Sequence, residues 1–200
     1  MINYTIDAAK GAMEKGDELC ISTDDSEIIQ VLRDNKIEVP FTRPPELASD
    51  SAGSEEVIIH AVEWYKGRGI VFDVVVLLQP TSPLRNTDHV KEALDLYTEE
   101  IDIVASVKET DSNPYYVLFE EDNDGFLRKS KDGNFTRRQE CPNVYEFNGA
   151  IYVLNYLSVI KTLKGERKKV KKYLMDKVHS IDVDDIIDFK TAEFFLEQRS

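Results

Sequence analysis

The stretch Val-Val-Val-Leu-Leu at 74–78, followed by Gln-Pro-Thr-Ser-Pro-Leu-Arg at 79–85, determines the fold class of this sequence. Five consecutive aliphatic residues are typical of a strand that is covered on both faces, as in a parallel sheet. Apolar residues at helical spacing flank this strand, from Ser54 to Gly67 before it and from Thr87 to Tyr97 after it. A second strand is predicted at 101–107. This alternation predicts an α/β fold of three layers (α/β/α) with a mostly parallel, Rossmann-like sheet.

The rest of the chain continues the pattern with less regularity. Further helices are predicted at 2–13, from Ser26 and from Asp185 onward, and further strands at 18–22, 115–119 and 144–154, with a turn at 122–125. The basic run 164–172 is interpreted as a solvated loop or helix face rather than a nucleic-acid patch. Since no linker or repeat divides the chain, we expect one domain over residues 1–200, with an insertion at about 110–155.

The composition excludes several classes of protein. The chain has 200 residues, with 25 Lys plus Arg against 38 Asp plus Glu and a formal net charge of −13. This charge repels phosphate backbones, so nucleic acid is not an expected partner. No apolar run approaches the ~20 residues of a membrane span, so we expect a cytoplasmic protein without membrane contact. Cys20 and Cys141 lie far apart, which predicts neither a disulfide nor a zinc site and fits a reducing compartment.

Ligands of such α/β sheets bind beyond the carboxyl ends of the strands, and three loops should reach that edge. These loops are 42–54, 79–85 and the region around 182–184. Two prolines fix the backbone of residues 79–83 directly after a buried strand, which predicts a rigid platform of amide and hydroxyl groups. An ordinary loop between a strand and a helix is the alternative interpretation.

Paired carboxylates follow a second expected strand end, at 179–181. Asp182 and Asp184 are spaced by one residue, so both side chains point to the same side of an extended backbone and can hold Mg²⁺ through oxygen ligands. In an acidic chain the same pattern also occurs as solvated turn residues. Asp185 and Asp188 can equally be caps of the last helix.

Arginines supply candidate anion contacts. Arg43 stands before two prolines and Arg138 lies in a pair with Arg137. Their planar guanidinium groups can bind phosphate or carboxylate, although exposed arginines often bind no ligand. Neither His60 nor His89 has a serine or cysteine nucleophile with supporting sequence nearby, so a Ser/His or Cys/His triad is not expected.

Six segments, taken in order, resemble the acylneuraminate cytidylyltransferase family, the CMP-sialic acid synthetases. They are residues 21–25, 41–50, 77–85, 137–139, 148–152 and 181–184, and together they span nearly the whole chain. The resemblance implies a fold like that of the nucleotide-diphospho-sugar transferases. It also implies transfer of CMP from CTP to the anomeric hydroxyl of a nine-carbon 2-keto sugar acid, with release of pyrophosphate, a Mg²⁺ cofactor and a homodimer.

The resemblance also assigns roles to individual residues. The residues that match positions around the nucleotide are Arg43, Ala52 and Ser54. Those that match positions near the sugar acid are Gln79, Arg138, Asn148 and Tyr152. Asp182 and Asp184 match the catalytic carboxylates that hold the metal. The segment 110–155 resembles the part that pairs two subunits and reaches towards the neighbouring site.

Two departures from the family pattern stand out. Relatives begin with a strand and a glycine-rich loop that cradles the triphosphate, whereas Met1 here stands directly before the match to residues 2–5. Because the opening strand of such a sheet is central, we expect neighbouring strands with unpaired backbone and exposed apolar sides, and strongly reduced or absent CTP turnover. Glu146 replaces an arginine that commonly precedes the Asn148 motif, and its carboxylate should repel an acidic sugar unless it faces away.

Two functional hypotheses follow from these observations. The first is a nucleotidyltransferase that uses Asp182 and Asp184 with Mg²⁺. The alternative is a non-catalytic relative that keeps the fold and the dimer surface and binds a partner or a sugar acid. A phosphatase that uses the same two aspartates is a poor fit, since its chemistry needs the pair after an early strand and a lysine further along. The sequence leaves the choice among sialic, legionaminic and pseudaminic acids open.

Overall fold

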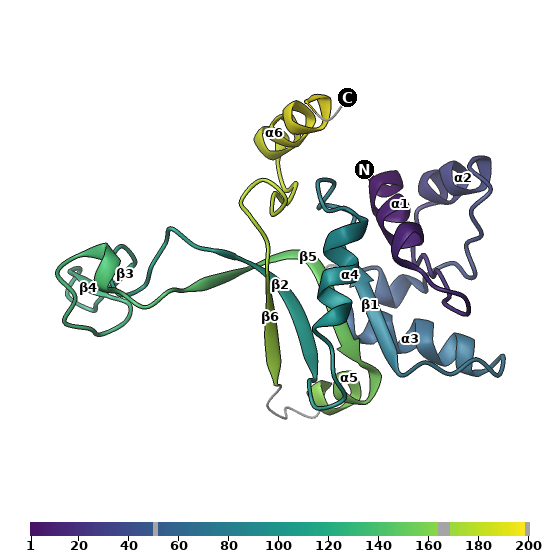
Figure 1. The fold of residues 1–200 in the computed structure, drawn as a ribbon, viewed down its shortest axis with the longest axis horizontal. Coiled ribbons are helices and arrows are strands. Elements are labelled where there is room, and N and C mark those ends of the chain that lie inside the picture. Colours follow the sequence, from purple (N-terminus) through teal and green to yellow (C-terminus); the bar gives the residue numbers. More distant parts are fainter. Residues whose placement is uncertain (50–51, 164–168, 199–200) are drawn as a thin grey trace.

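The structure of the chain, a computed structural model, describes residues 1–49, 52–163 and 169–198 (Figure 1). The helices are α1 (Ile2–Ala12), α2 (Ser26–Asp34), α3 (Ser54–Lys66), α4 (Thr87–Asp95), α5 (Tyr156–Leu163) and α6 (Ile186–Glu197), with short 3₁₀ turns at Pro45–Leu47 and Arg138–Glu140. The strands are β1 (Val74–Leu78), β2 (Ile103–Glu109), β3 (Phe119–Glu121), β4 (Leu127–Lys129), β5 (Tyr145–Asn155) and β6 (Val170–Leu174).

Four strands form the main sheet, in the order β1-β5-β2-β6. β5 runs antiparallel to both of its neighbours, whereas β2 and β6 are parallel. β1, β2 and β6 therefore point the same way, and β5 alone runs against them. The predicted α/β class is confirmed, with a mixed sheet in which three of the four strands share one direction.

Helices cover both faces of this sheet, as a strand of five aliphatic residues predicts. On one face Val74, Val76 and Leu78 of β1 pack in the core cluster that contains buried alanines of α1 and α4. On the other face Val75 and Leu77 pack in the cluster that contains buried residues of α3 and α5. Successive side chains of a strand point to opposite faces, which is why the run has no polar position.

The outer edge of β1 has no strand partner in the described part of the chain. The strand expected at 18–22 is not formed: this segment lacks a ladder, and the neighbouring contact is one isolated parallel bridge between Thr23 and Thr42. A strand needs a partner for its backbone groups, and local sequence cannot supply one. Ile21 instead packs beside Ile6 and Leu32 in a third core cluster.

Strand β6 was not expected, because it falls at the end of the basic run 164–172. Residues 164–168 of that run lie outside the described residues. In β6 itself only Tyr173 is buried, and an edge strand with lysines on its open side lacks the apolar signature of an inner strand. The expected strand 115–119 is also replaced, by a turn and the short β3–β4 hairpin. The turn predicted at 122–125 is confirmed.

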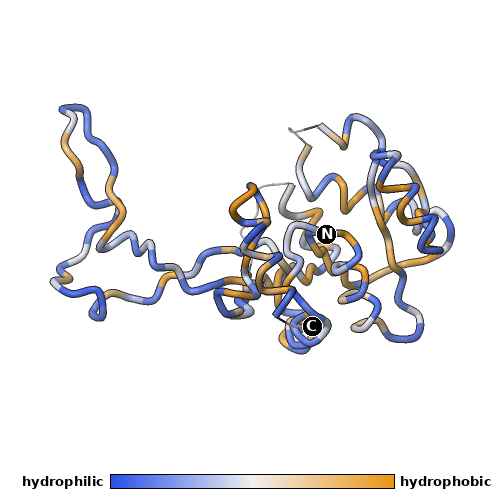
Figure 2. The backbone as a smooth tube through the Cα atoms, turned by 90° about the horizontal axis from the view of Figure 1, so that it is seen from above, coloured by the Kyte–Doolittle hydropathy of each residue, from blue (hydrophilic) through white to orange (hydrophobic). Residues whose placement is uncertain are grey.

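The β3–β4 hairpin belongs to an arm, residues 110–144, that projects far from the sheet (Figure 1). Apolar stretches lie along it between polar ones (Figure 2). Both cysteines are free thiols, as expected. None of the helices in the described ranges is long and apolar enough to cross a membrane.

Candidate functional site

Gln79 and Asp182 meet over the backbone of Gly149. A Cβ atom added to Gly149 would lie 2.6 Å from Gln79 Oε1 and 3.2 Å from Asp182 Oδ2. The loops that carry the two side chains are joined directly, because the backbone N–H of Val183 donates to the carbonyl of Thr81 at 2.8 Å. The loop after β1 and the loop after β6 therefore converge beside β5, at the strand ends where the fold class places ligands.

Tyr152 belongs to the same group. It lies on β5 opposite Leu77 of β1 and Ala105 of β2. Burial raises the pKa of its hydroxyl, and the negative charge of Asp182 raises it further. Gln79 and Asp182, both assigned by resemblance, thus meet at Gly149, and Tyr152 lies close enough for the charge of Asp182 to act on its hydroxyl.

Buried polar atoms without hydrogen-bond partners occur in the same two loops. Of the four buried side-chain atoms that lack a hydrogen bond in the described residues, three belong to the converging loops: Ser82 Oγ, Arg85 Nη1 and Asp182 Oδ1. Leaving such an atom unsatisfied costs about 1–3 kcal/mol, so each of these atoms calls for a partner such as an ordered water, an ion or a ligand. The orphaned oxygen of Asp182 fits a hard cation such as Mg²⁺.

A magnesium ion here would draw few ligands from the protein. No group of three or more histidine, cysteine, aspartate or glutamate side chains is arranged to hold a metal within the ranges that the structure covers. Mg²⁺ is commonly bound by one or two carboxylates together with substrate phosphates and water. The Asp182 and Asp184 pair is compatible with that mode.

Asn148 has its amide engaged inside the protein. Its side chain is 3% exposed. Its Oδ1 accepts from Ser106 Oγ at 2.5 Å, and its Nδ2 donates to Ser180 Oγ at 2.9 Å. This network ties β2 and β5 to the residue two positions before Asp182, so Asn148 fixes the loop that carries the carboxylate. Its direct contact with a sugar acid stays a prediction.

Arg138 and Asp184 lie nearer the surface. Arg138 pairs with Asp111, and Asp111 also pairs with Lys177, which links the base of the arm to the segment that follows β6. Asp184 is exposed, and its backbone N–H donates to Asp188 Oδ2 at 3.2 Å. The capping interpretation is confirmed for Asp185, whose Oδ1 accepts from two N–H groups in the first turn of α6.

The three residues matched to the nucleotide lie in a different loop. The guanidinium of Arg43 donates to the hydroxyl and the carbonyl of Ser22. Ala52 is half-buried, and Ser54 is the first residue of α3. In the portion of the chain that the structure describes, none of their hydrogen bonds reaches Gln79 or Asp182. Their role at the nucleotide therefore stays a prediction.

Glu146 carries a compensated charge. It stands opposite Lys108 in the β2–β5 ladder, and its Oε1 lies 3.1 Å from Lys108 Nζ. Burial raises the pKa of Glu146, but hydrogen bonds from Lys108 and Thr110 outweigh this effect and lower it. The ion pair reduces the repulsion that a free carboxylate would exert on an acidic ligand.

Sequence reasoning missed the residues that hold the site together. Ser106 and Ser180 are buried and bind Asn148, yet neither was a candidate. A serine inside the apolar run 101–107 was the available signal, since a polar residue in a buried strand needs a partner. The Asn148-Gly149 pair was a second signal in the sequence, because such a pair favours a positive φ, and Gly149 has a φ of +72°.

Comparison with known proteins agrees with this geometry. A family model described as cytidylyltransferase matches residues 1–200. Over its whole length the chain is 31% identical to a post-translational flagellin modification protein B of Campylobacter coli and covers 85% of that protein. Over 96% of its length it is 33% identical to an N-acylneuraminate cytidylyltransferase of Escherichia coli, of which it spans 45%.

A solved structure shows the same fold at low sequence similarity. It is a CMP:2-keto-3-deoxy-manno-octonic acid synthetase complexed with CTP, with a TM-score of 0.68 and 12% identity, and the match covers all of this chain and 88% of that one. At this identity the match supports the fold alone. Because the family model extends over every residue and the flagellin modification protein is 31% identical over the whole chain, the chain belongs to the cytidylyltransferase family.

Proposed function

We propose that this protein transfers CMP from CTP to the anomeric hydroxyl of a nine-carbon 2-keto sugar acid, sialic acid or a close relative, and releases pyrophosphate. The observation that carries this proposal is the meeting of Gln79 and Asp182 at Gly149, with Tyr152 within reach of the Asp182 charge, in a chain of the cytidylyltransferase family. The group combines an amide, a phenol and a carboxylate with an orphaned oxygen. Such a set can orient a polyhydroxylated acid beside a phosphate.

Each residue has a role that its chemistry supports. The amide of Gln79 and the hydroxyl of Tyr152 orient the acceptor sugar through hydrogen bonds. Arg138 is half-exposed, so its guanidinium can exchange the carboxylate of Asp111 for that of the sugar acid. In the loop before α3 and at the first residue of that helix, Arg43, Ala52 and Ser54 contact the nucleotide.

Asp182 and Asp184 would hold Mg²⁺. When bound there, the ion neutralises charge on the triphosphate and on the α-phosphoryl group during the attack. Asp182 is prepared for this role because Asn148 fixes its loop through Ser180. No hydrogen bond to Asp182 Oδ1 from the described residues has to break before a cation binds there.

The test uses the wild-type chain with CTP, Mg²⁺ and a panel of sugar acids. We expect CTP binding to give heat in a calorimeter in the presence of Mg²⁺, and pyrophosphate release that depends on a nine-carbon acid. Sialic, legionaminic and pseudaminic acids are compared, with an eight-carbon 2-keto acid as the control acceptor. Binding of a sugar acid without any metal-dependent heat from CTP would contradict the proposal and favour the non-catalytic alternative.

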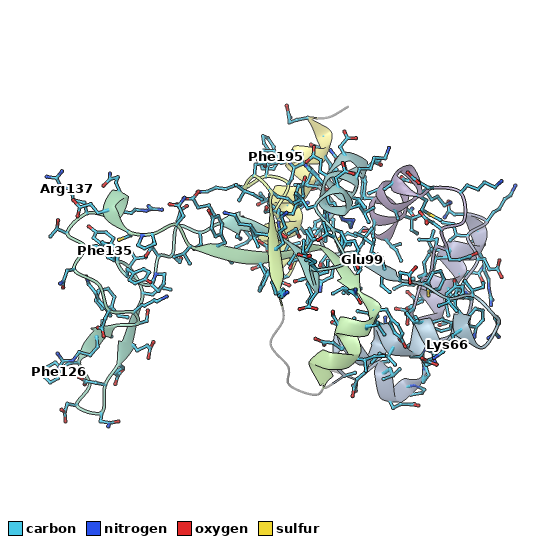
Figure 3. The ribbon with its side chains drawn as sticks, turned by 60° about the horizontal axis from the view of Figure 1, so that its bottom comes forward. Lys66, Glu99, Phe126, Phe135, Arg137 and Phe195 are labelled. Carbon is cyan, nitrogen blue, oxygen red and sulfur yellow. The ribbon has the colours of Figure 1, made fainter. Side chains whose placement is uncertain are left out.

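We also propose that residues 110–155 pair two copies of the chain. A two-stranded hairpin is marginal on its own in water, yet the arm exposes a series of large apolar side chains: Val117, Leu118, Phe119, Phe126 and Leu127. Phe126, Phe135 and Arg137 lie on this arm, far from Lys66 on the body (Figure 3). Burial of these side chains in a second copy would explain their exposure.

We expect light scattering to give the mass of two chains for the wild type. Replacing both Phe126 and Leu127 with serine should shift the mass to that of one chain at micromolar concentration, because each buried large apolar side chain contributes about 1.5–3 kcal/mol. Val71→Ser is the matched control, since Val71 is 75% exposed but lies on the body. A double variant that remains dimeric would exclude this surface.

A further inference from the structure

The ladder between β1 and β5 opens at the candidate site. Its last pair is Leu78 with Ile151, so the next residues in register are Gln79 and Ala150. The carbonyl oxygens of both residues accept hydrogen bonds from the guanidinium of Arg85. Arg85 Nη2 lies 3.0 Å from Gln79 O, and Arg85 Nε lies 3.3 Å from Ala150 O. One side chain thus bridges the two strands at the point where they separate.

Arg85 is held tightly in this position. It is 2% exposed, and its Nη2 also donates to Thr5 Oγ1 of α1 at 2.7 Å. Three elements, α1, the end of β1 and the middle of β5, therefore share one guanidinium. A lysine at this position would supply a single ammonium group, which lacks the planar guanidinium fork whose N–H groups reach acceptors in several directions.

The position of Arg85 also has an energetic cost. Its hydrogen-bond acceptors are carbonyl and hydroxyl oxygens, and none of its bonds in the described ranges goes to a carboxylate. Burial lowers the pKa of the guanidinium to about 10, which records the penalty of placing a charge away from water. Its Nη1 has no hydrogen-bond partner among the residues that the structure describes. A buried charge without an ionic partner adds little to the stability of the fold, so stability alone does not explain an arginine at this position.

The candidate site lies directly beyond this bridge. The backbone of Gln79 is held by Arg85, and the side chain of the same residue lies against Gly149 and near Asp182. Ala150, the other bridged residue, follows Gly149 in the chain. The distance between the two carbonyls therefore sets where the Gln79 amide stands relative to Gly149.

We propose that Arg85 is a positioning residue of this site: it holds β1 and β5 apart beyond Leu78 and so keeps the Gln79 amide in place for the sugar acid. Arg85 acts through Gln79 and touches no ligand. The nature of the ligand rests on the proposed function. The bridge itself rests on the geometry of the strands, so the two can be tested separately.

The first test is a double-mutant cycle of Arg85→Lys and Gln79→Ala. In the wild-type background Arg85→Lys should weaken sugar-acid binding and raise its KM by about tenfold, the effect of losing one charge-assisted hydrogen bond. The KM for CTP should stay unchanged. In the Gln79→Ala background the same change should cost less than about twofold, because the residue through which Arg85 acts is already absent. Equal losses in both backgrounds would overturn the proposal.

The second test needs no ligand. Hydrogen exchange of the amides of Gln79, Thr81 and Ser82 and of residues 149–151 should become at least about tenfold faster in Arg85→Lys, while the amides of α3 keep their rates. Thr5→Val removes one outer contact of the guanidinium and should speed the exchange of the same amides by a smaller factor. It provides the test if the Arg85 variant does not fold. Arg33→Lys, at an exposed position of α2, is the matched control.

The outcomes separate the two ideas. If the wild type binds neither CTP nor a sugar acid, the proposed function fails, while the exchange rates still decide the role of Arg85. If exchange at Gln79, Thr81 and Ser82 is unchanged in Arg85→Lys and Thr5→Val, the bridge does not position this loop, whatever the protein binds.

Discussion

Asp182→Asn should abolish metal-dependent CTP turnover while the fold stays intact or becomes slightly more stable. Asparagine keeps the size of the side chain and one carbonyl oxygen, but it removes the charge that a hard cation requires. Loss of one such electrostatic contact lowers turnover by about 10²–10³-fold. The free energy of unfolding should not fall, because the substitution removes a carboxylate whose Oδ1 is buried without a partner.

This combination distinguishes a functional carboxylate from a structural one. The measurements are pyrophosphate release, calorimetry of CTP with and without Mg²⁺, and the thermal midpoint of each variant. Glu99→Gln is the matched control, since it removes one exposed negative charge in the loop that leads to the start of β2, whereas the site lies beyond the carboxyl ends of β1 and β6. Loss of stability together with activity in Asp182→Asn would show that the carboxylate supports the fold. Full metal-dependent turnover would remove Asp182 from the site.

The strongly patterned elements could be predicted from the sequence alone. Helix α3 carries an apolar stripe over thirteen residues, and β1 is a run of five aliphatic residues, so both have a local signal. The local signal of β6 is weak, because only one of its five side chains is buried. The segment 18–22 reads as a strand but forms none. Whether an extended segment becomes a strand depends on a partner distant in sequence.

The same distinction applies to the candidate site. Gln79 and Asp182 could be brought together from sequence because both follow strands, and the ends of strands that point the same way share one edge of a sheet. The residues that hold Gln79 and Asp182 in place could not be brought together in this way. Ser106 and Asn148 are 42 positions apart, and Arg85 and Ala150 are 65 apart. Such contacts arise from the register of strands, which a single sequence does not display.

Arg85 illustrates the limit most clearly. In the sequence it is the last residue of the polar loop 79–85, and nothing there marks it as buried. In the structure it is buried and spans two strands and a helix. Its residue type was informative, but its function depends on the opening of the β1–β5 ladder, which becomes visible only with the coordinates.

Gly149→Ala should eliminate ligand binding and destabilise the fold. Gly149 has a φ of +72°, in a region that costs a residue with a side chain about 1–3 kcal/mol. The new methyl group would also lie 2.6 Å from Gln79 Oε1 and 3.2 Å from Asp182 Oδ2. The Gln79 amide would have to leave its position, and the Asp182 carboxylate would have to give by a few tenths of an ångström. Calorimetry with CTP and sugar acid should then give no heat.

Two further variants separate the backbone effect from the steric one. Gly69 has a φ of +84° and open space where its Cβ would be, so Gly69→Ala should bear the backbone cost and still bind both ligands. Combining Gly149→Ala with Gln79→Ala removes the nearer clash and should recover part of the lost stability without restoring binding. If Gly149→Ala binds ligands as well as Gly69→Ala does, the ligand does not require Gln79 and Asp182 at this point. The site would then have to lie elsewhere on the sheet edge.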